Sequence, residues 1–214
     1  MVMPNQIIFS GPMIQAILHG RKTETRRTVK PQPPEDTSRV TLDWLRTGSN
    51  SYVQHYGFDD DNTRYLSPYG GPGELLRVRE TWAVASTYDA LPPSEIPRCE
   101  VSYAATDDIT GLKKRSPIHM PTWMSRISLR VTAVRVERLQ DISELDAVME
   151  GMDFGYPTRD SMLRRLADAR TPQLSDPASP VSEYRQLWNS LNAKRGFPWE
   201  GDPWVWVVQF EQVD

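Results

Sequence analysis

The stretch of residues 125–139 constrains the fold of this chain most, because its apolar side chains alternate with a period of two. One parity carries Ile127, Leu129, Val131 and Ala133, and the other then carries Val134 and Val136. A strand whose apolar phase slips by one residue is typical of a β-bulge or a barrel corner. The sequence therefore predicts a long, bent strand in the core of a curled sheet.

Shorter elements of both kinds surround this strand. Strands are predicted at residues 6–9, 74–79, 100–104 and 204–210, and helices after Ser10, after Ser143 and from Val181. The segment Ser143 to Asp146 is a capping box in its acidic variant, and Gly20, Gly151 and Gly196 are helix stops. With no GxGxxG segment or P-loop, the order predicts an α+β domain rather than a parallel βαβ fold.

The length of 214 residues predicts a single domain spanning 1–214. Two polar stretches, at about 28–70 and 153–181, interrupt the periodic segments and are interpreted as insertions. Their composition is compatible with narrowing a cleft, building a homodimer or contacting a partner, and it favours none of these.

Charge and cysteine content exclude several classes of protein. The formal charge is 25 − 28 = −3, which argues against coating of long duplexes by bulk electrostatics. Cys99 is the single cysteine and the three histidines are scattered, so no metal site and no cofactor are expected. Without an apolar leader or a run of roughly 18 apolar residues, a cytoplasmic protein without membrane contact is expected.

The densest chemical segment is GRKTETRR at residues 20–27. Extended to Lys30, it holds five basic residues and one acid, a local excess of 5 − 1 = +4. Guanidinium and ammonium groups beside the Thr23 and Thr25 hydroxyls suit a phosphate or a polar base edge. On composition alone, a solvated basic turn explains the same residues.

This segment resembles the GRKTxTxR motif of small ASCH-domain proteins, which belong to the PUA-like β-barrel family and act as N4-acetylcytidine amidohydrolases. The resemblance continues through GELLRV at 73–78, AVMEGM at 147–152 and WVWVVQF at 204–210. It covers roughly 100 residues and leaves the two insertions unmatched. Segments similar to PYGxPGD, RETW and IHMPRW also occur in ASCH proteins of phages and prophages. The resemblance implies a curled or barrel-like mixed sheet with short flanking helices.

The resemblance also implies three catalytic positions. Lys22 matches the family's general base, Thr25 its nucleophile and Glu150 its proton donor. A desolvated lysine can deprotonate a threonine hydroxyl that attacks an amide. At the end of its helix, Glu150 faces the negative end of the dipole, which favours the protonated acid. An exposed helix-end glutamate is the structural alternative for Glu150.

A second group of residues is predicted to grip RNA or a modified nucleoside. Aromatic and charged side chains interleave in RETW at 79–82 and IHMPTWMSR at 118–126, and such groups stack bases. The predicted binding residues are Arg21, Thr23, Arg26, Arg27, Arg79, Glu80, Trp82, His119, Trp123 and Arg126. A lone histidine such as His119 is more often a packed, hydrogen-bonded residue than a catalyst.

Three functions remain open on the sequence. The first is hydrolysis of an amide on a modified nucleoside by Lys22, Thr25 and Glu150. The second is a non-catalytic PUA-like module that holds RNA by the same basic segment. The third is a ribonuclease in which Lys22 and an arginine stabilise the phosphate and His119 moves protons.

Overall fold

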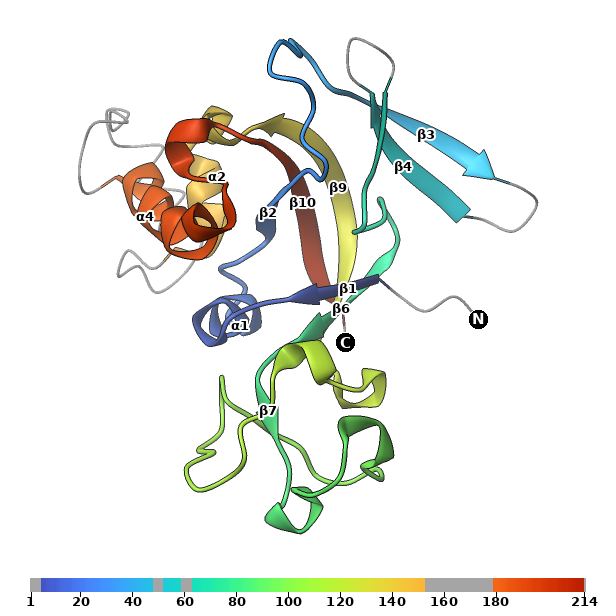
Figure 1. Cartoon of the computed structure of the whole chain (residues 1–214), viewed down its shortest axis with the longest axis vertical. Helices are drawn as coiled ribbons and strands as arrows, with labels where there is room; N and C mark the ends of the chain where they lie inside the picture. The colour runs from blue at the N-terminus through green and yellow to red at the C-terminus, as the bar shows by residue number, and fades with distance from the viewer. Residues whose placement is uncertain (1–4, 48–51, 59–62, 153–178, 214) are drawn as a thin grey trace.

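A computed structural model describes residues 5–47, 52–58, 63–152 and 179–213 of the chain. Its centre is a mixed five-stranded sheet in the order β1-β6-β9-β10-β2 (Figure 1). These strands are β1 (Asn5–Ile8), β6 (Leu75–Arg79), β9 (Ser128–Arg138), β10 (Trp204–Val213) and β2 (Glu24–Thr28). β1 and β6 are parallel and the other neighbours antiparallel. The predicted α+β class is confirmed, and the sheet is open, with β1 and β2 as its two edges.

The remaining elements are short. The α-helices are α1 (Gly11–Leu18), α2 (Glu144–Met149) and α4 (Pro180–Asn192). Further strands are β3 (Thr41–Thr47), β4 (Tyr52–Phe58), β5 (Arg64–Leu66), β7 (Trp82–Ala83) and β8 (Ser102–Tyr103). Single 3₁₀ turns are η1 (Ser86–Tyr88), η2 (Pro93–Glu95), η3 (Pro117–His119), η4 (Thr122–Met124), η5 (Leu139–Asp141), η6 (Ala193–Arg195) and η7 (Trp199–Gly201). None of these described helices is long and apolar enough to cross a membrane.

The bend predicted in the long strand is a β-bulge in β9. Gln209 of β10 lies opposite Ala133 and Phe210 lies opposite Val131, so Thr132 has no partner in the register. The extra residue returns Val134 to the buried face and leaves Ala133 only half-buried. The phase slip is therefore confirmed, and it lies one residue earlier than the alternation indicated.

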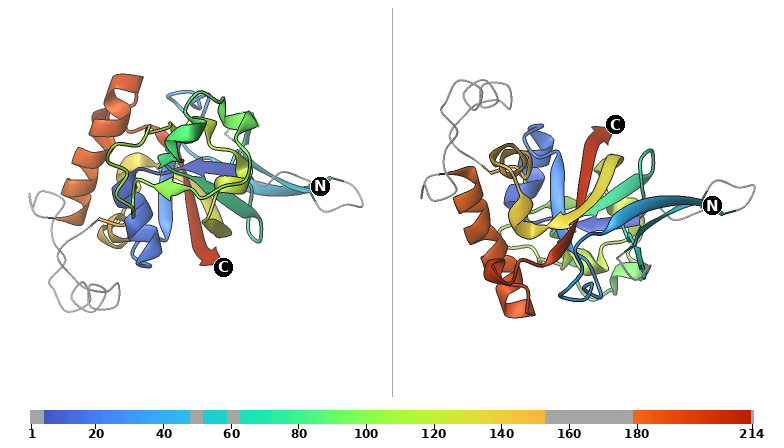
Figure 2. Two further views of the ribbon diagram at one scale, coloured as in Figure 1. Left: turned by 90° about the horizontal axis from the view of Figure 1, so that it is seen from below. Right: turned by 90° about the horizontal axis from the view of Figure 1, so that it is seen from above.

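β10 is buried on both faces. Trp204, Trp206, Val208 and Phe210 face a first apolar cluster, together with Phe9, Ile14 and Leu76. Val205 and Val207 face a second cluster with Tyr184 and Trp188 of α4. We call the side of the first cluster the inner face of the sheet and the opposite side the outer face. Figure 2 shows α4 and the β3–β4 arm on opposite sides of the central sheet.

Residues 82–126 form a lobe that the sequence analysis did not separate from the rest. Its cluster contains Trp82, Val84, Ile96, Met120 and Met124, and β7 pairs with β8 beside it. The lobe extends from the end of β6 (Figure 1). Its connections are turns without periodic spacing, which explains why the sequence pattern did not reveal a third core.

The predicted insertions have different outcomes. The stretch 28–70 contains an antiparallel three-stranded sheet, β3-β4-β5, which was not predicted. The stretch 153–178 lies outside the described residues.

The predicted capping box of α2 is present. The Ser143 hydroxyl accepts a hydrogen bond from Asp146 N, and the Asp146 carboxylate accepts one from Ser143 N. Leu145 of α2 is 43% exposed, and the six-residue helix packs through Ala147 and Val148.

Gly151 brings the end of α2 against the segment before β2. Its φ is +87°, and a Cβ there would lie 2.7 Å from the Lys22 Cβ and 2.9 Å from the Ala16 Cβ. We therefore expect Gly151→Ala to lower the free energy of unfolding by about 2–4 kcal/mol, from backbone strain plus overpacking. Denaturant unfolding measures this change.

Gly196→Ala is the matched control. Gly196 has a φ of +88° and a Cβ there would contact nothing within 4 Å. Only the strain remains, so a loss of about 1 kcal/mol is expected. Equal losses for the two variants would contradict the close packing of Gly151 against Lys22.

Candidate functional site

The predicted basic turn is in large part a strand. β2 pairs with β10, with Thr25 opposite Val208 and Arg27 opposite Trp206. Side chains alternate along it, so Thr25 and Arg27 share the inner face with Val208 and Trp206. The Arg27 guanidinium carbon lies 5.2 Å from the centre of the Phe9 ring, as this alternation requires. Glu24 and Arg26 consequently point to the outer face, toward α2 and α4.

Among the described strands, none lies beside the other edge of β2. Phe210 N donates to Thr23 O and Val29 N to Trp204 O, so odd-numbered residues pair with β10. The backbone groups of Glu24 and Arg26 therefore point away from the sheet. Two buried side chains satisfy them: Lys22 Nζ donates to Glu24 O over 2.8 Å, and Arg26 N donates to Glu150 Oε1 over 2.6 Å.

Lys22 and Glu150 also bind one another. Lys22 Nζ lies 2.6 Å from Glu150 Oε2 and 2.8 Å from Glu150 O, and the two side chains are 2% and 5% exposed. With Glu24 O, these acceptors use all three ammonium hydrogens. Burial lowers the pKa of Lys22, and the adjacent Glu150 carboxylate opposes this only in part. Lys22 is therefore desolvated in this structure, and its ammonium contacts Glu150 rather than the Thr25 hydroxyl.

Tyr184 of α4 holds the other carboxylate oxygen. Its hydroxyl donates to Glu150 Oε1 over 3.2 Å. Burial, and then the negative charge of Glu150, raise the pKa of Tyr184, so the phenol stays protonated and remains a donor. Glu150 is thus fixed by β2, α4 and Lys22 together.

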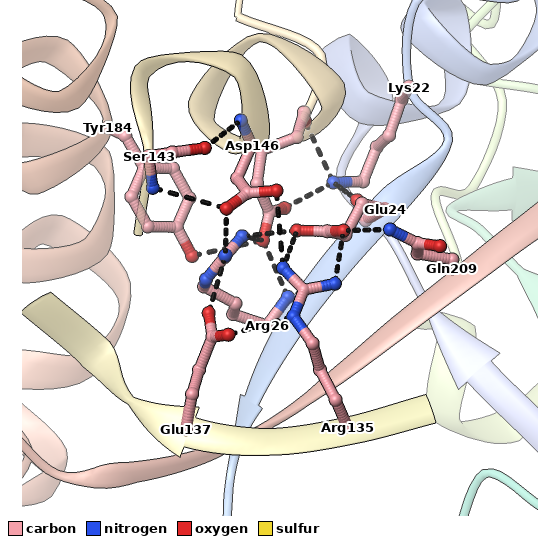
Figure 3. Close-up of polar contacts among 10 residues, drawn as sticks. Lys22, Glu24, Arg26, Arg135, Glu137, Ser143, Asp146, Tyr184 and Gln209 are labelled. Atoms are coloured by element: carbon pink, nitrogen blue, oxygen red, sulfur yellow. Dashed lines mark hydrogen bonds and ion pairs between the residues drawn. The ribbon is translucent and has the colours of Figure 1, made fainter. Parts of the chain in front are cut away.

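A cluster of charges continues from Arg26 across the outer face (Figure 3). The Arg26 guanidinium lies 2.6 Å from Glu24, 2.7 Å from Glu137 and 3.2 Å from Asp146. Arg135 binds the same three carboxylates at 2.8–3.2 Å. Burial alone would raise the pKa of Asp146, but the Ser143 N–H and the two arginines lower it.

The charges of this cluster nearly cancel. Three cations (Lys22, Arg26 and Arg135) face four carboxylates (Glu24, Glu137, Asp146 and Glu150), which leaves 3 − 4 = −1 with all groups ionised. Arg26 was predicted to bind substrate, yet it is 3% exposed and its guanidinium faces these carboxylates. Its role in this structure is to neutralise a buried cluster.

The other residues of the basic segment lie around the same edge. Arg21 and Thr23 are half-buried, and Thr23 N donates to Met149 O at the end of α2. Arg27 Nη2 donates over 2.7 Å to Ile8 O, on the free edge of β1. Thr25 is 3% exposed, and its hydroxyl is not among the three acceptors of Lys22.

The predicted residues from the RETW and IHMPTWMSR segments lie at the start of the lobe. Arg79 donates to Ile118 O, and Glu80 is 2% exposed and takes two hydrogen bonds from Arg126. The Arg126 guanidinium lies 4.0 Å from the centre of the Tyr103 ring. These contacts hold the lobe to the end of β6.

The aromatic residues of these segments differ in accessibility. Trp82 is 0% exposed in the core of the lobe, so its ring is not free to stack a base in this structure. Trp123 is half-buried against the same cluster, and His119 is exposed in η3. Across the described residues, no group of three or more His, Cys, Asp or Glu side chains is placed to hold a metal ion.

Sequence reasoning missed the residues that surround the Lys22–Glu150 pair. Glu24, Arg135, Glu137 and Asp146 form the ionic cluster, and Tyr184 anchors Glu150. The signal for Arg135 and Glu137 was their shared parity on β9, opposite the buried valines. Tyr184 lies in the helix predicted from Val181, and nothing in the sequence indicated that its hydroxyl would bind Glu150.

Comparisons with known proteins add little. No protein-family model matches the chain, and no curated protein matches it. A crystal structure of a protein from Enterococcus faecalis V583, described with the family model DUF984, is similar with a TM-score of 0.42 and 13% sequence identity. The match covers 100% of this chain and 82% of that one. A similarity of this size assigns no family.

Removing the Arg26 charge tests how much the ionic cluster contributes to the free energy of unfolding. We expect Arg26→Met to lower the free energy of unfolding by about 3–5 kcal/mol, because it leaves buried carboxylates without their counter-ion. Urea unfolding gives the value. Arg185→Met is the control, since the Arg185–Glu200 pair is exposed and an exposed pair contributes no more than about 1 kcal/mol. Similar losses would mean that the cluster is hydrated rather than buried.

Proposed function

We propose that this chain is a PUA-like protein of the ASCH type that hydrolyses an amide on a modified nucleoside such as N4-acetylcytidine. The observation that carries the proposal is the buried Lys22–Glu150 pair, which binds the backbone of β2, the strand that bears Thr25. Lys22, Thr25 and Glu150 are the positions that the motif resemblance assigns to base, nucleophile and acid. An open mixed sheet with short flanking helices is compatible with a PUA-like fold.

The pair can supply a base and an acid in one step. Moving one proton from Lys22 Nζ to Glu150 Oε2, 2.6 Å away, converts the ion pair into an amine and a carboxylic acid. The total charge of the site does not change, so the transfer has no added cost of burying a net charge. Desolvation of Lys22, which lowers its pKa, favours this neutral form.

Acyl transfer to Thr25 then involves two proton transfers. The Lys22 amine takes the Thr25 hydroxyl proton as Oγ1 bonds to the amide carbonyl carbon, and the Glu150 acid protonates the departing nitrogen as the C–N bond breaks. The products are an acetyl ester on Thr25, the free amino group of cytidine, an ammonium and a carboxylate. Water then hydrolyses the ester and releases acetate.

This sequence of steps requires Thr25 to approach Lys22. Lys22 Nζ lies 2.8 Å from the carbonyl oxygen of Glu24, the residue directly before Thr25. The Lys22 amine, which acts as the base, therefore contacts the residue that directly precedes the nucleophile Thr25. A hydrogen bond between the two forms in the complex with substrate, as catalytic contacts often tighten on binding.

A second function has one observation in its favour. Every hydrogen of the Lys22 ammonium already binds the protein, and Arg26 N is capped by Glu150. A saturated pair of this kind also serves to stabilise a strand edge. The second candidate is therefore a non-catalytic module that binds RNA through the same region.

Hydrolysis of N4-acetylcytidine distinguishes these functions. The wild-type protein is expected to release cytidine, measured by chromatography, and Thr25→Val to lower kcat/KM by at least about 100-fold. Thr25→Val keeps the shape of the side chain and removes the hydroxyl. Lys22→Met should be equally inactive, whereas Lys194→Met, at an exposed lysine of η6, should match the wild type. A wild-type protein without turnover would favour the binding module.

The pH profile tests the role of Lys22. The active form holds one proton between the Lys22 amine and the Glu150 acid, so kcat/KM should rise as the fully protonated pair loses its first proton and fall as it loses the second. Because burial lowers the pKa of Lys22, the falling limb should begin below the usual range of lysine. The residual activity of a folded Lys22→Arg variant should show no such falling limb, since arginine stays protonated. A falling limb that persists in Lys22→Arg would assign the base to another residue.

A further inference from the structure

The bulge in β9 coincides with a division of the outer face into a covered and an uncovered half. Beyond Thr132, α2 and α4 cover the outer face, and Val205 and Val207 are 0% exposed there. Before Thr132, the outer face consists of β1, β6, the first half of β9 and the end of β10. Ile8 and Leu75 on this half are 41% and 39% exposed, so it is open to solvent at these two residues.

Three arginines occupy this uncovered half. Leu76, Val78 and Leu129 point to the inner cluster, so their neighbours Arg77, Arg79 and Arg130 point outward. Arg77 lies opposite Ser128 and Arg130 opposite Leu75, which makes Arg77 and Arg130 diagonal neighbours. Such neighbours are about 7–8 Å apart, and Arg77 and Arg79, two positions apart on β6, are about 6.7 Å apart. We call the surface formed by Ile8, Leu75, Arg77, Arg79 and Arg130 the arginine face.

These arginines have no acidic partner in the part of the chain that the structure describes. Arg79 donates to a carbonyl, Ile118 O, and Glu211 lies opposite Arg130 in the register without forming an ion pair with it. The Nε atom of Arg77 is buried without an acceptor. The covered half differs, since Arg26 and Arg135 there bind several carboxylates. Although the chain has a net charge of −3, the guanidinium groups of Arg77, Arg79 and Arg130 thus form no ion pair within the described residues.

We propose that the arginine face binds the phosphates of single-stranded RNA. An extended strand of RNA offers anionic groups in series, which suits guanidinium groups spread over three neighbouring positions rather than gathered around one ion. Exposed Ile8 and Leu75 lie between the arginines and offer apolar surface to the bases. An acidic peptide would match the charge but not these apolar side chains.

The arginine face and the Lys22 site meet at Ile8. Its carbonyl oxygen accepts from Arg27 on the inner side of the sheet edge, and Arg79 lies opposite it in the register of β6. RNA held on the arginine face would therefore run past the edge that carries the Lys22 region. This part of the inference rests on the proposed function, and it assigns the substrate class as a modified nucleoside within RNA.

Fluorescence anisotropy with a labelled single-stranded RNA of about 12 nucleotides tests this face. The full-length wild type should bind, with an affinity that falls steeply between ~50 and ~200 mM salt. Arg77→Gln with Arg130→Gln should weaken binding by about tenfold or more. The slope of log K against log salt should become shallower by about 1.4, because each lost contact contributes about 0.7.

A matched pair of substitutions controls for the loss of two charges. Arg185→Gln with Arg195→Gln removes two exposed arginines near α4 and should leave the affinity within about twofold of wild type. Both double variants should unfold within about 1 kcal/mol of wild type, since the side chains of Arg77 and Arg130 make no hydrogen bond or ion pair within the described residues. Unfolding curves verify this before binding is compared.

Three results would overturn the proposal: a wild-type protein that does not bind, equal binding by the Arg77 and Arg130 variant, or displacement of RNA by poly-glutamate at equal charge concentration. The last result would indicate an acidic protein as the partner. The measurement involves no turnover, so its outcome is separate from that of the N4-acetylcytidine assay.

Discussion

The ion pair between Lys22 and Glu150 is the interaction on which the rest of this structure depends. It occupies the position that a sixth strand would take beside β2, with Lys22 donating to Glu24 O and Glu150 accepting from Arg26 N. Replacing backbone partners with two charges is stable here because every hydrogen of the ammonium and both carboxylate oxygens have partners. The same contact desolvates Lys22 and lowers its pKa, so the interaction that completes the edge of β2 also changes the acidity of the lysine.

β10 and the bulge in β9 organise the surroundings of this pair. Because β10 is buried on both faces, one strand links the inner cluster to the helices on the outer side. The bulge at Thr132 returns Val134 to the buried face, and beyond it Arg135 and Glu137 meet the outward residues of β2. The ionic cluster and the helices then cover one half of the outer face, and the other half carries Arg77, Arg79 and Arg130, of which Arg130 is exposed and the other two are half-buried.

Alternating apolar residues predicted the parts of the fold that depend on local periodicity. The long strand with its phase slip, the parity of Trp204 to Phe210 and the capping box of α2 were predicted correctly because each signal lies within a few residues. β2 was interpreted as a turn, since Glu24 and Arg26 are polar and their partners on β9 and at the end of α2 lie 111 to 124 residues away in the sequence. Lys22 and Glu150 were identified by motif resemblance, whereas Arg135 and Tyr184 carried no comparable signal.

Both open edges of the central sheet are occupied by side chains rather than by strands. Arg27 holds the carbonyl of Ile8 on β1, and Lys22 with Glu150 holds the groups of β2. An incoming strand from another molecule would have to displace and dehydrate these charges before it could add to the sheet. The arrangement therefore protects both edges of the sheet from edge-to-edge aggregation.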